Sequence, residues 1–310
     1  MATNALLHPA TPRLDLPLTG EAFCHSHHGE LIQGAIRLPG GGQAPCLVSL
    51  PRLDRGSACR LALFRSDALE VVPAWKGKAL RAARLTLARF GLPHATGRLL
   101  LDCALGAGLG LGSSTADVVA AIRAVAAALG TRLSPGEIAA IAVAAETACD
   151  PVMFEAPALL FAPRQGRVLE DWGRWFPDYI VLGCTLRPGT AGIDTLSLPP
   201  DASDTMLDRF ERIVAAARQG FRRRDLAAIA AAATESARLN QRRVRLEWFE
   251  PLRRIAAEAG ALGVQIAHSG VVGGVLLDPH DPGLERKIDA LAAAWRRLGG
   301  GEFALFRTGR

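Results

Sequence analysis

The sequence predicts a globular chain of mixed helices and strands, long enough for two domains or one large one. Its 310 residues are 49% hydrophobic and 21% charged, which is ample for a folded core. Glycine and proline follow no repeat, so a collagen-like or fibrous chain is excluded. Short apolar runs broken by turns come first, and stretches with helical spacing follow. A stretch rich in proline and glycine at 157–177 predicts a domain boundary.

The N-terminal half is predicted to start with strands. From 20 to 64, short apolar runs alternate with glycine and proline, including the turn signal Pro39–Gly42. Residues 76–90 carry apolar side chains at helical spacing and predict a helix. A strand at 99–103 then leads into a glycine loop, and a helix with its apolar stripe over 118–129 follows.

A further helix is marked by its own start and stop signals. Ser134 is the expected N-cap, Pro135 occupies the first helical position, and Glu137 completes a capping box. Pro151 disfavours helical geometry at the residue before it, so the helix should end near Cys149. Beyond the boundary we expect strands at 179–186, 264–267 and 275–277, and helices at 204–219, 224–238, 250–262 and 283–298.

Composition narrows the classes of protein that fit. The net charge is +6, and three of the 36 basic residues are lysines, so arginine supplies nearly all the positive charge. Much of the arginine falls on the exposed faces of alanine-rich helices without interleaved aromatics, so we expect no nucleic-acid partner. The six cysteines form no CxxC pair, which indicates neither a disulfide framework nor a zinc site. No export signal and no apolar stretch of about 20 residues is present, so we expect a cytoplasmic chain without a membrane partner.

The glycine loop is the first candidate binding site. Gly108, Gly110 and Gly112 alternate directly before two serines and a helix. The backbone can approach a ligand closely there, and the helix N-terminus favours an anion such as phosphate. The loop lacks the lysine of a Walker A motif and the third glycine of the dinucleotide fingerprint. The phosphate charge would then be neutralised by the helix dipole, a serine-bound metal or an arginine. The alternative is an ordinary turn with Ser113 or Ser114 as N-cap.

Two carboxylates follow on the next predicted helix. Glu146 continues a row of apolar residues at intervals of four, and Asp150 extends that row. A negative charge in the last helical turn opposes the helix dipole. A divalent cation between the two groups, such as Mg²⁺ on substrate phosphates, would explain both positions. The alternative is that both carboxylates are solvated at a fraying helix end.

The histidines indicate no metal centre. On an extended strand, His25 and His27 should share one face and His28 the other, which argues against a shared metal. We expect these side chains at the surface or lining a pocket. His268, in a second glycine loop, is expected to be a turn residue bonded to the backbone.

Three ordered segments resemble motifs of the GHMP small-molecule kinases. Leu105–Ala116 reads LGAGLGLGSSTA and is similar to their phosphate-binding motif. Cys24–Gly34, CHSHHGELIQG, and Ala267–Asp278, AHSGVVGGVLLD, occur in the expected order on either side of it. Within the superfamily, the strings at 29–34, 113–117 and 267–270 are similar to the L-threonine kinase family of propanediol utilisation and cobalamin synthesis.

The resemblance implies a two-domain α+β fold. Its N-terminal domain would be of the ribosomal protein S5 domain 2 type and its C-terminal domain ferredoxin-like. We assign 1–20 to an N-terminal extension, 21–165 to the ATP-binding domain and 175–310 to the C-terminal domain. The implied reaction transfers the γ-phosphate of ATP to the hydroxyl of L-threonine, a small-molecule partner, giving O-phospho-L-threonine for the aminopropanol arm of cobalamin.

The resemblance also implies roles for individual residues. Ser114 and Glu146 would bind Mg²⁺, with Glu146 and Asp150 as the catalytic carboxylates. Asp150 or Glu30 would face the acceptor hydroxyl, and Glu30 and Gln33 would lie on the side of the substrate ammonium group. His268 and Ser269 complete the substrate-binding set. The ATP-binding residues would be Gly106, Ala107, Gly108, Leu109, Gly110, Leu111, Gly112, Ser113, Ser114 and Thr115.

The sequence departs from the family pattern at several positions. Gly106 replaces a proline and Thr115 the usual alanine of the phosphate motif, and His25 stands where the first motif usually has proline. Two alternatives remain open: another kinase of the superfamily, such as homoserine kinase, and a non-catalytic regulator of the same fold that binds a nucleotide or metabolite. With so few lysines, we expect any side-chain cation at the triphosphate to be an arginine.

Overall fold

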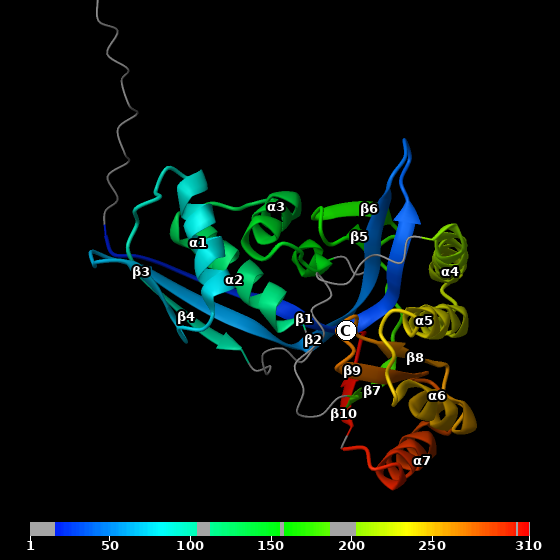
Figure 1. The fold of residues 1–310 in the computed structure, drawn as a ribbon. Helices are drawn as coiled ribbons and strands as arrows, with labels where there is room; N and C mark the ends of the chain where they lie inside the picture. Colours follow the sequence, from blue (N-terminus) through cyan, green and yellow to red (C-terminus); the bar gives the residue numbers. More distant parts are fainter. Residues whose placement is uncertain (1–15, 104–111, 156–157, 187–202, 302, 310) are drawn as a thin grey trace, which may run out of the picture.

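Ten strands of the described residues form one sheet, covered by helices (Figure 1). The computed structural model describes residues 16–103, 112–155, 158–186, 203–301 and 303–309. The sheet order is β10-β7-β9-β8-β1-β2-β4-β3, and β5 pairs with β2 and β6. The strands are β1 Leu18–Arg37, β2 Gln43–Leu63, β3 Leu69–Val72, β4 Gly97–Cys103, β5 Leu159–Ala162, β6 Arg167–Asp171, β7 Ile180–Thr185, β8 Gly263–Ile266, β9 Val272–Leu277 and β10 Ala304–Arg307. The helices are α1 Gly77–Arg89, α2 Ser113–Ala128, α3 Pro135–Glu146, the 3₁₀ helix η1 Pro151–Phe154, α4 Asp204–Arg223, α5 Leu226–Asn240, α6 Phe249–Glu258 and α7 Leu284–Arg297.

The first two strands are much longer than the short strands expected between 20 and 64. β1 and β2 have 20 and 21 residues and form an antiparallel hairpin, closed by the glycine turn predicted at 39–42. The glycine and proline within β2 are tolerated because the pairing register shifts: His25 pairs with Gly56, whereas Ser26 pairs with Arg52. Such irregularities bend a strand and redirect its side chains.

The N-terminal half packs α1, α2 and α3 on one face of the sheet around β1, β2 and β4 (Figure 1). The predicted helix after the glycine loop is confirmed as α2, and its apolar residues Val118, Ile122 and Val125 are completely buried. Because this helix lies within the core, its N-terminus has a fixed position. It therefore places residues 112–115 at a defined point beside the sheet.

The C-terminal half carries β7–β10 and helices α4–α7. Its strands pair antiparallel, with β9 between β7 and β8. A second core packs Phe210 and Val214 of α4 against Leu31 of β1 and Val48 of β2. The long hairpin therefore contributes to the cores of both halves, and the boundary between residues 165 and 175 stays a prediction. No helix of the described ranges is long and apolar enough to cross a bilayer.

The capping box that starts α3 is confirmed, and the end of this helix corrects one expectation. Ser134 accepts the backbone N–H of Glu137, whose side chain accepts the backbone N–H of Ser134. The helix ends at Glu146, because Thr147 has a φ of 75°. Asp150 is therefore not one more residue of the helical row with Glu146. It lies beyond the helix, as the N-cap of η1.

Candidate active site

The start of α2 is the described part of the predicted phosphate site. Gly112 is the N-cap with a left-handed φ of 66°, and a Cβ there would lie 2.1 Å from Cδ2 of His27. Glycine is thus required by the backbone and by the close histidine. Ser113 follows it and is buried. The other predicted ATP-binding residues lie outside the described part of the chain: Gly106, Ala107, Gly108, Leu109, Gly110 and Leu111.

Two successive hydroxyl groups bind the carboxylate of Glu146. Ser114 Oγ donates to Oε2 at 2.7 Å, and Thr115 Oγ1 donates to Oε1 at 2.8 Å. The Glu146 side chain is 2% exposed, and this burial raises its pKa to about 7. The structure thus joins Ser114 and Glu146, the two predicted magnesium ligands, although they are 32 residues apart. A hydroxyl and a carboxylate are hard oxygen ligands of the kind that Mg²⁺ prefers, so this donor set fits the ion.

The cation that the structure places beside Glu146 is a lysine. Lys78 Nζ, in the first turn of α1, lies 3.9 Å from Glu146 Oε2 and is largely exposed. Nothing in the sequence indicated this lysine, because the sequence does not show that α1 starts beside the end of α3. An arginine at the triphosphate stays a prediction. Two residues earlier, buried Lys76 pairs with Asp117 of α2, which also accepts the hydroxyl of Ser57 at 2.6 Å. This buried contact fixes the start of α1 against α2.

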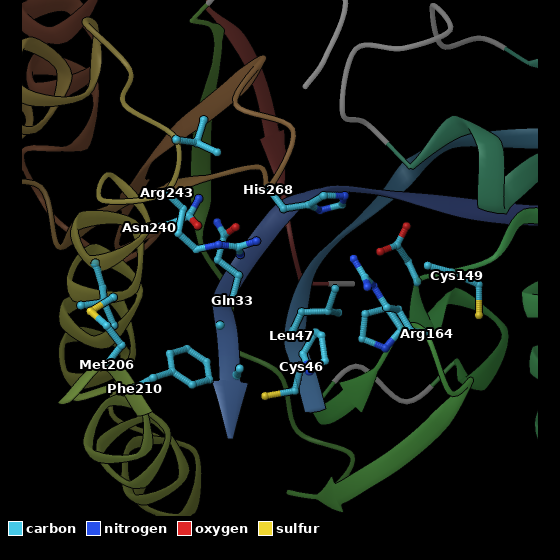
Figure 2. A pocket seen from close by; sticks show the side chains of 18 residues that line it. Gln33, Cys46, Leu47, Cys149, Arg164, Met206, Phe210, Asn240, Arg243 and His268 are labelled. Atoms are coloured by element: carbon cyan, nitrogen blue, oxygen red, sulfur yellow. The ribbon is translucent and has the colours of Figure 1, made fainter. Parts of the chain in front are cut away.

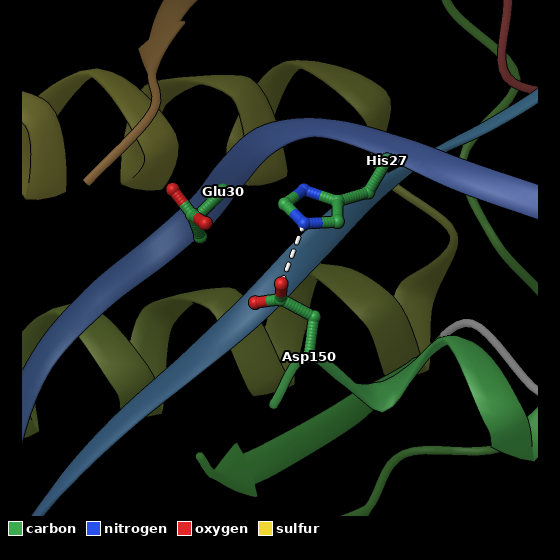
Figure 3. Close-up of side chains that lie close together, drawn as sticks. All are labelled: His27, Glu30 and Asp150. Carbon is green, nitrogen blue, oxygen red and sulfur yellow. Dashed lines mark ion pairs between the residues drawn. The ribbon is translucent and has the colours of Figure 1, made fainter. Parts of the chain in front are cut away.

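Asp150 contacts His27 of β1, which is distant from it in the sequence. His27 Nε2 lies 2.8 Å from Asp150 Oδ2, and the imidazole is almost completely buried (Figure 3). Burial alone would lower the pKa of His27, but the charge of Asp150 dominates together with its contact and raises it. Burial alone would likewise raise the pKa of Asp150, whereas the charge of His27 holds it low. The two groups therefore form an ion pair.

The three N-terminal histidines correct the expectation from strand alternation. His25 is exposed and packs edge-on against Phe23, whereas His27 and His28 are both buried. The register shifts around 25–32 explain why neighbouring residues do not alternate. His28 faces the C-terminal half, where its Nδ1 lies 2.8 Å from Nε2 of Gln265, and burial lowers its pKa to about 3.

Glu30 is completely buried and binds His268. Its Oε2 accepts the backbone N–H of His268 at 2.7 Å, and its Oε1 lies 2.6 Å from the ring Nδ1. Glu30 also pairs with Ile266, where β1 meets β8. His268 is thus more than the turn residue we expected. Glu30 thus holds His268 in place, and its contact with the substrate stays a prediction.

The side chains of His27, Glu30 and Asp150 lie close together (Figure 3). One ligand atom of each falls within 4.8 Å of the others, which is close enough to share a cation. The sequence argued against a metal shared by the N-terminal histidines. Of these three histidines, His27 alone belongs to this group. In the structure these groups pair with one another and with His268: Glu30 accepts from His268, and Asp150 lies against His27. We therefore treat the cluster as two ion pairs.

The ion pair of His268 predicts a pH dependence of stability. The charge of Glu30 raises the pKa of His268 from 6.5 to about 9. A raised histidine pKa adds stability that is complete below pH 6.5 and is lost as the pH rises through 9. The melting temperature of the wild type should therefore fall more steeply across this range than that of His268→Gln. Exposed His94→Gln is the control, and equal slopes for all three proteins would contradict the ion pair.

A cavity of about 170 Å³ has Asp150 in its lining. Figure 2 shows this cavity from close by, with Cys149 and His268 among the labelled lining residues. It lies between β1, β2, α4, the end of α5 and the segments after α3 and β5. Its lining combines apolar side chains such as Phe210 and Met206 with polar ones. The polar lining residues are Gln33, Asp150, Arg164, Asn240, Arg243 and His268.

Of the predicted substrate-binding residues, Gln33 lines this cavity and Ser269 does not. Gln33 lines it, and its side-chain amide donates to the carbonyl of Ile266 at 2.6 Å. Ser269 is buried in the loop between β8 and β9 and is not part of the lining; its hydroxyl has no hydrogen-bond partner among the described residues. Asn240, Arg164 and Arg243 are lining residues that sequence reasoning missed. They come from distant segments and carry no local motif.

Comparisons with known proteins assign the family. The model of the GHMP kinases N terminal domain matches residues 77–155, and that of the GHMP kinases C terminal domain matches 217–297, which together is more than half of the chain. No curated protein sequence is matched significantly.

Solved structures share the fold at low sequence identity. Homoserine kinase from Cytophaga hutchinsonii has a TM-score of 0.70 at 15% identity, covering 96% of each chain. Mevalonate kinase from L. major, in complex with R-mevalonate, has a TM-score of 0.62 at 15% identity and 97% coverage of each chain. Galactokinase from Lactococcus lactis, complexed with galactose, has a TM-score of 0.66 at 12% identity, covering 94% of this chain and 93% of its own. The chain therefore belongs to the GHMP kinase superfamily, has its two-domain fold, and is an ATP-dependent kinase of small molecules.

Proposed function

We propose that this kinase phosphorylates the side-chain hydroxyl of L-threonine, giving O-phospho-L-threonine for the aminopropanol arm of the cobalamin nucleotide loop. The resemblance of the segments at 29–34, 113–117 and 267–270 to L-threonine kinase motifs supports this choice. ATP would lie along the glycine loop at 106–112, with its phosphates at the N-terminus of α2. The acceptor would occupy the cavity beside Asp150.

The lining of this cavity carries the proposal. Its volume of about 170 Å³ is well below the range of roughly 300–1,000 Å³ that is typical for drug-sized ligands. Arg164 and Arg243 offer guanidinium groups for a carboxylate, and Asp150 lies at the same cavity. A small molecule with both a carboxylate and a hydroxyl suits this arrangement better than a neutral sugar.

The reaction requires mainly positioning and charge neutralisation. Phosphoryl transfer passes through a loose transition state, so little covalent help is needed. Mg²⁺ bound at Ser114 and Glu146 would neutralise negative charge on the phosphates. Asp150, held by His27 at 2.8 Å, would orient the acceptor hydroxyl and accept its proton. Lys78 lies close enough to Glu146 to add positive charge on the same side.

Homoserine is the alternative acceptor within this class. It differs from threonine in the position of the hydroxyl on a small amino acid, and a homoserine kinase shares the fold at a TM-score of 0.70. Such similarity at 15% identity indicates the fold and leaves the choice of acceptor to experiment. A non-catalytic regulator of the same fold is disfavoured by the intact group of Ser114, Glu146 and Asp150.

An ADP-release assay with Mg·ATP tests the proposal directly. The acceptors are L-threonine, L-serine, L-homoserine, mevalonate and galactose. Threonine-selective turnover, with O-phospho-L-threonine identified by mass spectrometry, is the expected result. Turnover with homoserine alone would reassign the enzyme, and nucleotide binding without turnover for any acceptor would favour the regulator.

A further inference from the structure

We propose that Thr115 positions Glu146, so that this carboxylate presents one defined oxygen to the metal ion of the bound nucleotide. The inference rests on the metal assignment made under the proposed function. Thr115 is buried in the first turn of α2 and contacts both Glu146 and Asp150. It also stands where the phosphate motif that this segment resembles usually has alanine, which has no hydroxyl.

The hydroxyl of Thr115 has a single hydrogen, which decides what it can do. Its oxygen lies 2.8 Å from Glu146 Oε1 and 3.3 Å from Asp150 Oδ2, so the shorter contact is the one to which it donates. The backbone N–H of Asp150 points at the same oxygen from 3.4 Å, a weaker contact. Thr115 thus lies between the two carboxylates and donates to Glu146.

The two oxygens of Glu146 therefore have different partners. Oε1 accepts the hydroxyl of Thr115, whereas Oε2 accepts the hydroxyl of Ser114 and lies 3.9 Å from Lys78 Nζ. Ser114 is the other proposed metal ligand, so Oε2 is the oxygen on the metal side. Thr115 holds the opposite oxygen and prevents rotation of the carboxylate. Hydrogen-bonded partners of ligating carboxylates orient them, and their loss typically costs about 10–100-fold in metal affinity or activity.

Thr115 also satisfies a buried acceptor. The Glu146 side chain is 2% exposed, so water cannot readily replace the lost donor at Oε1. A buried acceptor without a partner is costly, and the carboxylate would turn toward whichever donor remains. With the threonine hydroxyl present, one orientation of the Glu146 carboxylate both gives Oε1 a hydrogen-bond donor and directs Oε2 toward the metal side.

Binding of Mn²⁺, a paramagnetic substitute for Mg²⁺, tests this role without turnover. Its dissociation constant is measured by electron paramagnetic resonance with saturating AMP-PNP and no acceptor. Thr115→Val keeps the shape and removes the hydroxyl, and it should weaken Mn²⁺ binding by about 10–100-fold. Thr115→Ser restores a hydroxyl and should restore most of the affinity. Thr115→Ala is the second variant without the hydroxyl, because alanine favours a helix.

Two further variants separate the possible causes. Thr86→Val removes another buried threonine hydroxyl, which bonds the carbonyl of Ala82 at 2.8 Å within α1, and should leave Mn²⁺ affinity unchanged. Glu146→Gln should weaken Mn²⁺ binding strongly. If Thr115→Val and Thr115→Ala bind Mn²⁺ with wild-type affinity while Glu146→Gln binds it weakly, the role of Thr115 is overturned and the metal assignment stands. Wild-type affinity in Glu146→Gln would overturn the metal assignment and this inference with it.

Discussion

Replacing Glu146 with glutamine is expected to lower kcat by roughly 100-fold or more while the fold stays intact, the scale seen when one preorganised group that stabilises transition-state charge is removed. Glutamine keeps the shape of the side chain and removes its charge. Ser114 and Thr115 donate to the two different oxygens of this carboxylate, at 2.7 and 2.8 Å, and glutamine replaces one of these oxygens with an NH₂ group that cannot accept. The metal ion would then lose a charged ligand at the phosphates.

The fold should tolerate this change because the carboxylate is not what stabilises it. Burial raises the pKa of Glu146 to about 7, which means that the folded state disfavours its charge. Removing a charge of this kind at pH 8 relieves a cost of burial, so the melting temperature and circular dichroism should not reveal unfolding. Activity is measured as ADP release over a range of Mg²⁺ concentrations.

The chain offers a matched control for this substitution. Glu258 is the last residue of α6, as Glu146 is the last residue of α3, but its side chain is exposed. Glu258→Gln should have wild-type kcat and wild-type dependence on Mg²⁺. A Glu146→Gln enzyme with near-normal turnover would refute the assignment of Glu146 as a metal ligand.

Features carried by local sequence were predicted well. The capping box of Ser134 and Glu137, the glycine turn at 39–42 and the buried stripe of α2 each depend on residues close together in the chain. Local chemistry determines these elements, because caps, turns and helical stripes involve neighbours a few residues apart.

Contacts across the chain were harder to predict. We placed Asp150 in a helical row with Glu146, but that helix ends at Glu146 and Asp150 lies beyond it. The pairing of His27 with Asp150 joins residues 123 positions apart, and the register shifts of β1 decide that His27 faces inward. A strand pattern with period two cannot reveal a bulge. Lys78 was overlooked because its proximity to Glu146 arises from the packing of α1 against α3.

Replacing Asp150 with asparagine is expected to lower kcat by about 100-fold, at the low end of the range for loss of a general base. Asp150 lines the cavity and its charge is held by His27, so it can orient the acceptor hydroxyl and take its proton. Since transfer proceeds through a loose transition state, the base contributes less than the metal ligands. ADP release with saturating L-threonine measures the effect, and exposed Asp289→Asn is the control.

The substitution also leaves a buried histidine without its ionic partner, and the experiment must separate this effect from catalysis. Removing one member of a buried ion pair can cost about 3–5 kcal/mol, because the remaining charge is left uncompensated. Adding His27→Gln to Asp150→Asn removes both charges, and the double-mutant cycle isolates their coupling. Stability should recover in the double variant, whereas kcat should stay low if Asp150 acts on the acceptor. Recovery of kcat together with stability would show that Asp150 serves the ion pair alone.

The single variant gives a second outcome. If kcat of Asp150→Asn stays within about threefold of wild type, the acceptor hydroxyl needs no protein base, because a loose transition state requires mainly positioning and charge neutralisation.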